Sequence, residues 1–169
     1  MLMLSVQGRV RAACEDDSER LAQVFRLSWL YAYRAIIPAQ DLDYLLRKRR
    51  ESWWKRALNS HRKIVVVETG DVVAGYAIFG PAHGSFTAGG EIFELYLTPE
   101  HLGHGLGELL FEGCRARMDA LGLDGLIVWA LSENDPAIEF YCRRGGRVVE
   151  RRWERVGKLA LLKLALCWD

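Results

Sequence analysis

Hydrophobic and polar residues follow two kinds of pattern along the chain, and these separate strands from helices. Short runs rich in β-branched and aromatic residues indicate strands, whereas apolar residues three and four positions apart indicate amphipathic helices. Strands are expected over Arg9–Ala13, Lys63–Glu68, Val72–Phe79, Glu91–Thr98, Leu126–Leu131, Arg147–Trp153 and Lys158–Cys167. Helices are expected from Asp16 to Arg34 and over Ala39–Asn59, Gly105–Leu121 and Asn134–Arg144.

The resulting order is β-α-α-β-β-β-α-β-α-β-β, which predicts one α/β domain of the α+β type over residues 1–169. Hairpins dominate the first half of this order, and strands alternate with helices in the second half. We therefore expect a mixed, mostly antiparallel central sheet with helices on both faces.

Composition narrows the class of protein. The chain has 169 residues, of which 50% are hydrophobic and 27% are charged, a balance typical of a globular domain. Lys and Arg number 23 and Asp and Glu number 22, so the net charge of +1 gives no electrostatic case for a nucleic-acid or membrane-surface binder. The basic run Arg47–Arg50 is interpreted as a solvated helix face.

Metal and redox chemistry find little support in the sequence. The four cysteines are scattered and form no CxxC pair, which favours free thiols in a reducing, cytoplasmic environment. His101 and His104 lie three residues apart in a glycine-rich stretch, but no third ligand is evident. We therefore expect no metal site.

The most informative segment is a strand followed by glycines at positions 103, 105 and 107 and then by an amphipathic helix. Glycine lets the backbone turn sharply and approach a ligand closely. The N–H groups at a helix start have no intrahelical partner and favour an anion such as phosphate. The segment therefore predicts a phosphate or pyrophosphate site.

Three alternatives compete for this loop. A nucleoside-triphosphate loop needs Lys and Ser or Thr after its last glycine, but Glu108 follows Gly107. A dinucleotide loop needs GxGxxG, whereas the spacing here is GxGxG, and Asp124 precedes a strand rather than following one. A glycine-rich turn without any ligand is the third alternative.

Two motifs together resemble the GCN5-related N-acetyltransferases. Gly105 and Gly107 match the Gly-x-Gly/Ala part of that family's coenzyme loop, although Leu102 stands where Arg or Gln is usual. A second motif starts a helix with Asn-x-x-Ala, continues with Phe-Tyr and ends at a glycine. It is matched by Asn134, Ala137, Phe140, Tyr141 and Gly145, although Gly146 replaces the usual Phe. The resemblance covers about residues 90–150.

The resemblance implies acetyl-CoA as cosubstrate and assigns the residues that bind it. The backbone of the glycine loop would hold the pyrophosphate, through Gly103, His104, Gly105, Leu106, Gly107 and Glu108. The strand residues Leu95, Tyr96 and Leu97 would pair with the pantetheine amides, and Asn134 would also bind pantetheine. Asn134 is equally suited to capping its helix, and both roles are compatible.

The catalytic expectations rest on acid–base chemistry. By resemblance Tyr141 would be the general acid, because a phenol is protonated at neutral pH and can donate to the departing thiolate. A base is needed to keep the amine neutral, and Glu94 and Glu91 are the candidates, with Glu94 preferred. Because these two lie three residues apart on one strand, we expect them to face opposite sides of it.

The acceptor is expected to be a primary amine of a small molecule or peptide, attacking directly in a ternary complex. Its pocket would come from the first two helices and the segment 81–90, with candidates Trp29, Tyr33, Trp53, Trp54, His83 and Phe86. Asp41 and Asp43 could attract a cationic amine. The alternative function is a non-catalytic coenzyme A-binding sensor or interaction domain. The apolar C-terminal strands also suggest a homodimer.

Overall fold

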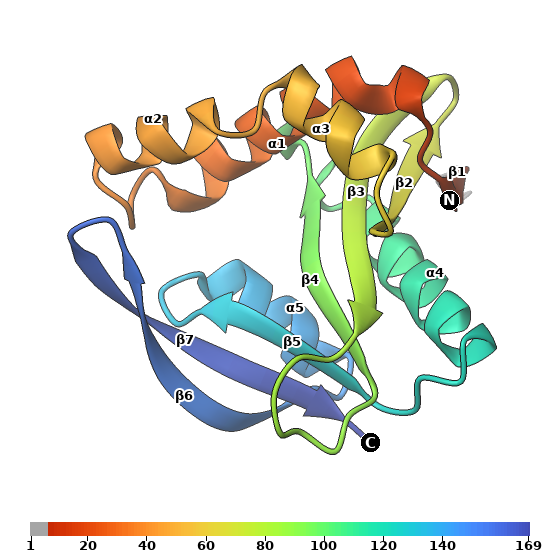
Figure 1. The fold of residues 1–169 in the computed structure, drawn as a ribbon. Coiled ribbons are helices and arrows are strands. Elements are labelled where there is room, and N and C mark those ends of the chain that lie inside the picture. The colour runs from red at the N-terminus through yellow and green to blue at the C-terminus, as the bar shows by residue number, and fades with distance from the viewer. Residues whose placement is uncertain (1–6) are drawn as a thin grey trace, which may run out of the picture.

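The computed structural model describes residues 7–169, which form seven strands and five α-helices (Figure 1). The strands are β1 (Gly8–Ala12), β2 (Lys63–Thr69), β3 (Val72–Pro81), β4 (Gly90–Leu97), β5 (Leu126–Leu131), β6 (Arg147–Val156) and β7 (Leu159–Trp168). The helices are α1 (Ser18–Tyr33), α2 (Ala39–Arg47), α3 (Glu51–Leu58), α4 (Leu106–Ala120) and α5 (Asp135–Arg143). No helix within residues 7–169 is both long and apolar enough to span a bilayer.

The strands form one mixed sheet in the order β1-β2-β3-β4-β5-β7-β6. Every neighbouring pair is antiparallel except β4 and β5, which pair in parallel only over Gly90–Ile92 and Leu126–Val128. Beyond that short stretch the two strands diverge, so the sheet opens between its two halves (Figure 1). The expected α/β class with a mostly antiparallel sheet is confirmed.

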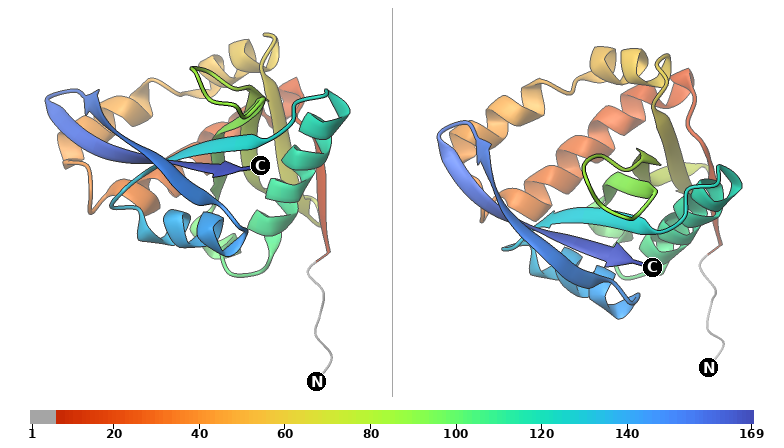
Figure 2. Two further views of the ribbon diagram at one scale, coloured as in Figure 1. Left: turned by 90° about the horizontal axis from the view of Figure 1, so that it is seen from below. Right: turned by 60° about the horizontal axis from the view of Figure 1, so that its bottom comes forward.

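Helices cover both faces of the sheet, as expected (Figure 2). Along β2 the apolar residues alternate between the two cores, because successive strand residues point to opposite faces. Val65 and Val67 pack with α4 and α5, whereas Ile64 and Val66 pack with α1 and α3. Both faces of this strand are buried, which explains its unbroken apolar sequence.

The helix expected over Ala39–Asn59 is instead two helices, so this prediction is wrong. The helix α2 ends at Arg47, Arg50 has an extended backbone with φ −74° and ψ 173°, and α3 begins at Glu51. The break lets each short helix turn its own apolar side to the core. It also places Arg49 between them, where its side chain reaches β4.

The two glutamates of β4 do not face opposite sides of the strand, which corrects a second expectation. Ile92 pairs with Phe79 of β3 and Glu94 pairs with the adjacent Ile78, so Phe93 is an extra residue in a β-bulge. A bulge shifts the side-chain alternation by one position. Glu91 and Glu94 consequently line the same cavity.

The Leu-rich β7 lies inside the sheet between β5 and β6, and β6 forms the edge at this end of the sheet. Trp153 on β6 is 67% exposed and is surrounded along the strand by charged residues. The homodimer stays a prediction.

Candidate active site

The loop between β4 and α4 has the backbone geometry that the glycines predicted. Gly103 and Gly105 have φ of +78° and +81°, in the left-handed region that favours glycine. The loop is braced by a 2.6 Å hydrogen bond between Thr98 Oγ1 and His101 Nδ1. Gly105 caps α4 without a side-chain hydrogen bond, so the first N–H groups of α4 are available to an anion.

A cavity of about 320 Å³ lies beside this loop, between β4, α1 and α5, and we call it the α5 cavity. Its walls are mostly apolar. It brings together six residues predicted to bind acetyl-CoA, namely Leu95, Tyr96, Leu97, Gly107, Asn134 and Tyr141. The other predicted residues (Gly103, His104, Gly105, Leu106 and Glu108) belong to the adjoining loop and first turn of α4. Leu102 also lines the cavity, and 41% of it is exposed.

Gly107 allows the start of α4 to pack closely on α5 and β4. A Cβ atom at this position would lie 3.2 Å from a ring carbon of Phe140 and 3.3 Å from Leu97 Cδ1. Both distances are tighter than ordinary van der Waals contact, so a side chain would push the helix start away. The last glycine of the loop therefore has a packing role as well.

Tyr141 and Asn134 lie at the two ends of α5. The Asn134 side chain accepts a hydrogen bond from the Ala137 backbone at 3.4 Å and so caps the helix. Burial of the Tyr141 phenol, reinforced by the nearby Tyr33, raises its pKa well above the ordinary value. Tyr141 is therefore protonated at neutral pH, and its hydroxyl bonds to no other group within residues 7–169.

A second cavity of about 350 Å³ lies where β4 and β5 diverge, and we call it the β4–β5 cavity. Trp29 and Tyr33 line it from α1, and Trp129 lines it from β5. Tyr96 lines both this cavity and the α5 cavity, and its hydroxyl lies 2.6 Å from that of Tyr33. Tyr96 is therefore part of the wall of both cavities, and Tyr33 lies on the β4–β5 side of it.

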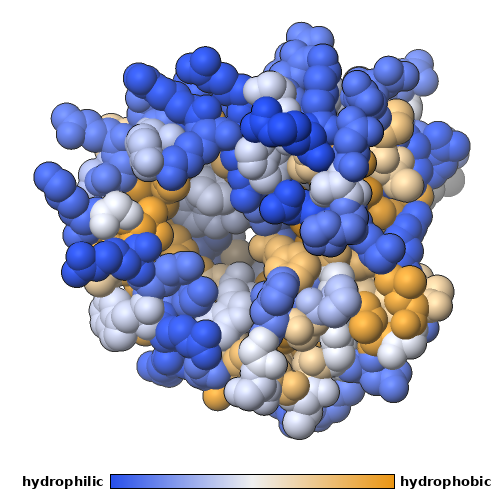
Figure 3. All heavy atoms as spheres, viewed as in Figure 1, coloured by the Kyte–Doolittle hydropathy of each residue, from blue (hydrophilic) through white to orange (hydrophobic). Residues whose placement is uncertain are grey.

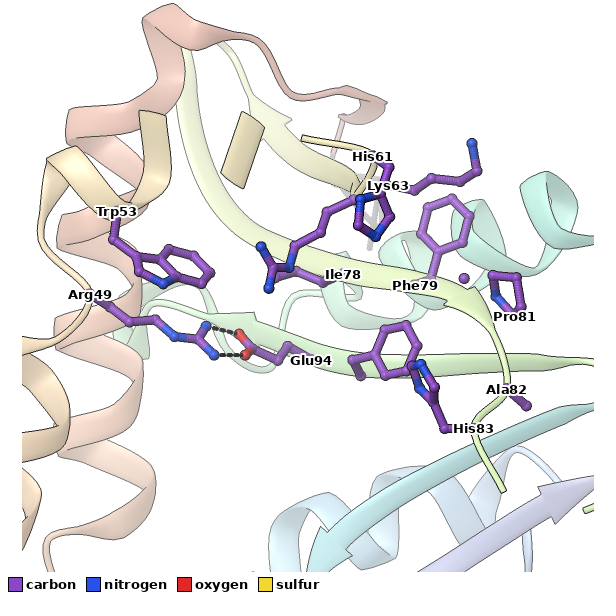
Figure 4. Close-up of a pocket in the computed structure, with 13 residues that line it drawn as sticks. Arg49, Trp53, His61, Lys63, Ile78, Phe79, Pro81, Ala82, His83 and Glu94 are labelled. Atoms are coloured by element: carbon purple, nitrogen blue, oxygen red, sulfur yellow. Dashed lines mark hydrogen bonds and ion pairs between the residues drawn. The ribbon is translucent and has the colours of Figure 1, made fainter. Parts of the chain in front are cut away.

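Glu94 is held in an ion pair at the wall of the β4–β5 cavity. Its Oε1 lies 2.5 Å from Arg49 Nη2, and its Oε2 accepts a bond from Arg49 Nη1 at 2.8 Å (Figure 4). The same Oε2 accepts a bond from the Tyr76 hydroxyl at 2.6 Å. Burial alone would lower the pKa of Arg49, but Glu94 outweighs this effect and raises it. The guanidinium also lies over the Trp53 ring at 4.3 Å.

Glu91 has a different environment from Glu94. Its Oε2 accepts a 2.9 Å hydrogen bond from the His83 backbone, and its other oxygen makes no hydrogen bond within the described residues. Its side chain is 9% exposed. Lys163, which lines the same cavity, pairs with Glu154 at 3.1 Å rather than with Glu91. Glu91 thus makes fewer hydrogen bonds than Glu94.

The remaining candidates for the acceptor pocket separate into groups. Trp53 and His83 line a further cavity described below, whereas Trp54 is fully buried in the core. Phe86 packs against Trp129, and Asp43 forms an ion pair with Arg47 on the surface of α2. Asp41 lies beside the turn at Gly157, where it would contact an added Cβ at 3.0 Å. Within residues 7–169, no group of three His, Cys, Asp or Glu side chains is arranged to hold a metal ion.

Sequence reasoning missed Arg49, Tyr76 and Lys163. Arg49 was interpreted as part of a solvated run, and no local pattern marks it as the partner of a strand residue 45 positions away. The apolar neighbours Phe25 and Trp53, which cover its guanidinium, come from two different helices.

Comparison with known proteins agrees with this geometry. Residues 21–145 match the model of the acetyltransferase (GNAT) family. The chain belongs to this family. It is 29% identical over 160 residues to an uncharacterized N-acetyltransferase, YuaI of Bacillus subtilis, covering 94% of this chain and 91% of that protein.

Solved structures of acetyltransferases share the fold. The PaiA N-acetyltransferase of Thermoplasma acidophilum in complex with coenzyme A has a TM-score of 0.75 at 18% identity, covering 93% of this chain and 98% of that one. The YncA acetyltransferase of Salmonella typhimurium, solved with acetyl-CoA, has a TM-score of 0.70 at 22% identity, covering 96% and 94%. This GNAT chain is accordingly an acetyl-CoA-dependent acetyltransferase, as the two motifs suggested.

Proposed function

We propose that this acetyltransferase transfers the acetyl group of acetyl-CoA to a primary amine of a small molecule or peptide, by direct attack in a ternary complex. The observation that carries the proposal is that Tyr96 lines both the α5 cavity and the β4–β5 cavity. A thioester held from one side and an amine held from the other would meet there without a covalent enzyme intermediate. A cytoplasmic location stays a prediction.

The chain offers a distinct group for each part of the coenzyme. The first N–H groups of α4, after Gly105, suit the pyrophosphate because they carry partial positive charge and no side chain caps them. The mostly apolar walls of the α5 cavity suit pantetheine, and the polar side chain of Asn134 lines the cavity at the start of α5. Bound acetyl-CoA supplies an activated acyl group with a thiolate leaving group.

Proton transfers are assigned to two residues. Tyr141, whose pKa is raised, holds its proton and can donate it toward the leaving sulfur. Between the glutamates, Glu91 is better suited than Glu94 to accept the amine proton. Both oxygens of Glu94 are already bonded to Arg49 and Tyr76, whereas one oxygen of Glu91 is free of such bonds within the described residues.

Steady-state kinetics tests the proposal. Thiol release is measured while acetyl-CoA and a primary amine are varied together across a panel of amines. Direct attack predicts reciprocal plots that intersect, whereas an acyl-enzyme intermediate gives parallel lines. Tight binding of acetyl-CoA with no turnover on any amine would instead favour the coenzyme A-binding sensor.

Replacing Gly105 with alanine should weaken acetyl-CoA binding by about tenfold, the equivalent of about 1.4 kcal/mol. An added Cβ would have open space around it, so the effect comes from the backbone, which alanine disfavours at φ +81°. The dissociation constant is measured by calorimetric titration.

Gly122→Ala is the matched control. Gly122 has a similar φ of +71° and equal open space, but it follows the other end of α4. Both variants should lose about 1–2 kcal/mol of unfolding free energy, because both carry the same backbone strain. Equal losses of acetyl-CoA affinity in the two variants would show that the loop has no special part in binding.

A further inference from the structure

A third cavity of about 600 Å³, larger than the two already described, lies beside α3 and the start of β2. We call it the basic cavity. It lies between Trp53 of α3, the start of β2 and the segment that follows β3 (Figure 4). The space-filling view, taken from the same side as Figure 1, is hollowed where β4 and β5 diverge, next to the basic cavity, with hydrophilic side chains gathered above the hollow (Figure 3).

The charges of the basic cavity are unequal. Its lining includes five cationic or titratable basic side chains, namely Arg49, His61, Arg62, Lys63 and His83. The only acidic side chain among its lining residues is Glu94, whose charge is already balanced by Arg49. His83 Nδ1 also lies 3.7 Å from Glu91 Oε2, so Arg62 and Lys63 are the lining cations without a carboxylate partner among the described residues.

Arg62 is the best-suited anion ligand in this cavity. Its guanidinium makes no hydrogen bond or ion pair within residues 7–169, in contrast to that of Arg49. It lies 5.5 Å from the centre of the Trp53 ring, which restricts its orientation. A guanidinium presents paired donors that match the oxygens of a carboxylate or phosphate.

The basic cavity adjoins the place proposed for the acceptor amine. Phe93 and Glu94, at the β-bulge of β4, line both the basic cavity and the β4–β5 cavity. A single acceptor that reaches both cavities would therefore pass the bulge at Phe93 and Glu94.

From this arrangement we infer that the acetyl acceptor carries an oxyanion, either carboxylate or phosphate, in addition to its amine. Arg62 binds the oxyanion, while the amine lies in the β4–β5 cavity. The inference rests on the proposed function, since it names the class of acceptor used by the same site.

Matched pairs of amines test the inference. The pairs are 4-aminobutanoate with 4-aminobutanamide, and 2-aminoethyl phosphate with 2-aminoethanol, so that the members of a pair differ chiefly in the anionic group. Thiol release should show kcat/KM about 10- to 100-fold higher for the anionic member. This ratio corresponds to the free energy of one charge-assisted hydrogen bond. Arg62→Ala should remove this preference and leave acetyl-CoA affinity unchanged.

Arg56→Ala is the matched control, because Arg56 is an exposed cation on α3 that does not line the basic cavity. It should retain the full preference for anionic amines. A preference that survives in Arg62→Ala, or turnover that is equal for both members of each pair, would overturn the inference and leave acetyl transfer to amines intact.

A binding measurement keeps the inference testable without turnover. Inorganic phosphate is titrated into the protein saturated with coenzyme A, which occupies the glycine loop, and the Arg62 Nε–H signal is followed by NMR. A saturable shift at millimolar phosphate supports the inference, and an unresponsive signal contradicts it. Coenzyme binding without turnover of any amine contradicts the proposed function instead, and the titration then decides the anion site alone.

Discussion

Replacing Tyr141 with phenylalanine should lower kcat by about 100-fold or more while acetyl-CoA still binds normally. The substitution removes only the hydroxyl, which bonds to no other group within the described residues, so the packing of the ring in the α5 cavity is kept. Without that proton donor the sulfur would have to leave as an unassisted thiolate. Turnover is measured by thiol release, and binding by calorimetric titration.

Tyr44→Phe provides the control for this change, because Tyr44 is 59% exposed on α2 and lies outside the cavities described above. It should leave both kcat and binding unaltered. Because burial raises the pKa of Tyr141 above the ordinary value near 10, kcat should not fall through its deprotonation below about pH 10. A Tyr141→Phe variant that keeps more than half of the kcat would exclude this phenol as the acid.

The part of the site that the sequence predicts is the part specified by local chemistry. The loop needs positive φ at two positions, and glycine, which readily adopts it, stands at both, Gly103 and Gly105. The start of α5 is marked by Asn134, whose side chain caps the helix. Each of these signals lies within a few residues of the structure that it specifies. The loop and the cap therefore follow from the residues themselves, whereas Tyr141 is singled out by the family resemblance.

The β4–β5 cavity, proposed to hold the acceptor amine, depends on pairings between segments distant in the sequence. The β-bulge at Phe93 exists because β3 and β4 pair with unequal spacing, and the apolar run of β4 does not reveal it. The break before Arg50 is similarly hidden, since α2 and α3 both continue a helical pattern. These two irregularities place Glu91 and Glu94 on one side and bring Arg49 to Glu94. Long-range contacts thus decide the surroundings of the candidate bases.

Replacing Arg49 with methionine should lower the free energy of unfolding by about 3 kcal/mol, because it leaves the Glu94 carboxylate largely buried without its countercharge. Methionine keeps an unbranched apolar chain against Trp53, so lost packing contributes little. Urea unfolding measures the change. Arg47→Met removes an exposed ion pair with Asp43 on the adjoining helix, and this control should cost about 0.5 kcal/mol or less.

A double variant distinguishes the role of Glu94 as the ion-pair partner of Arg49 from a role as the catalytic base. Glu94→Gln in the Arg49→Met background removes the stranded charge yet still accepts the Tyr76 hydroxyl, so part of the lost stability should return. If Glu94 serves only to hold Arg49, the double variant also keeps most of its kcat. If Glu94 is instead the base, Glu94→Gln alone and the double variant both lose about 100-fold in kcat, even where stability is restored. Stability and turnover measured on the same four proteins therefore distinguish a positioning residue from a catalytic one.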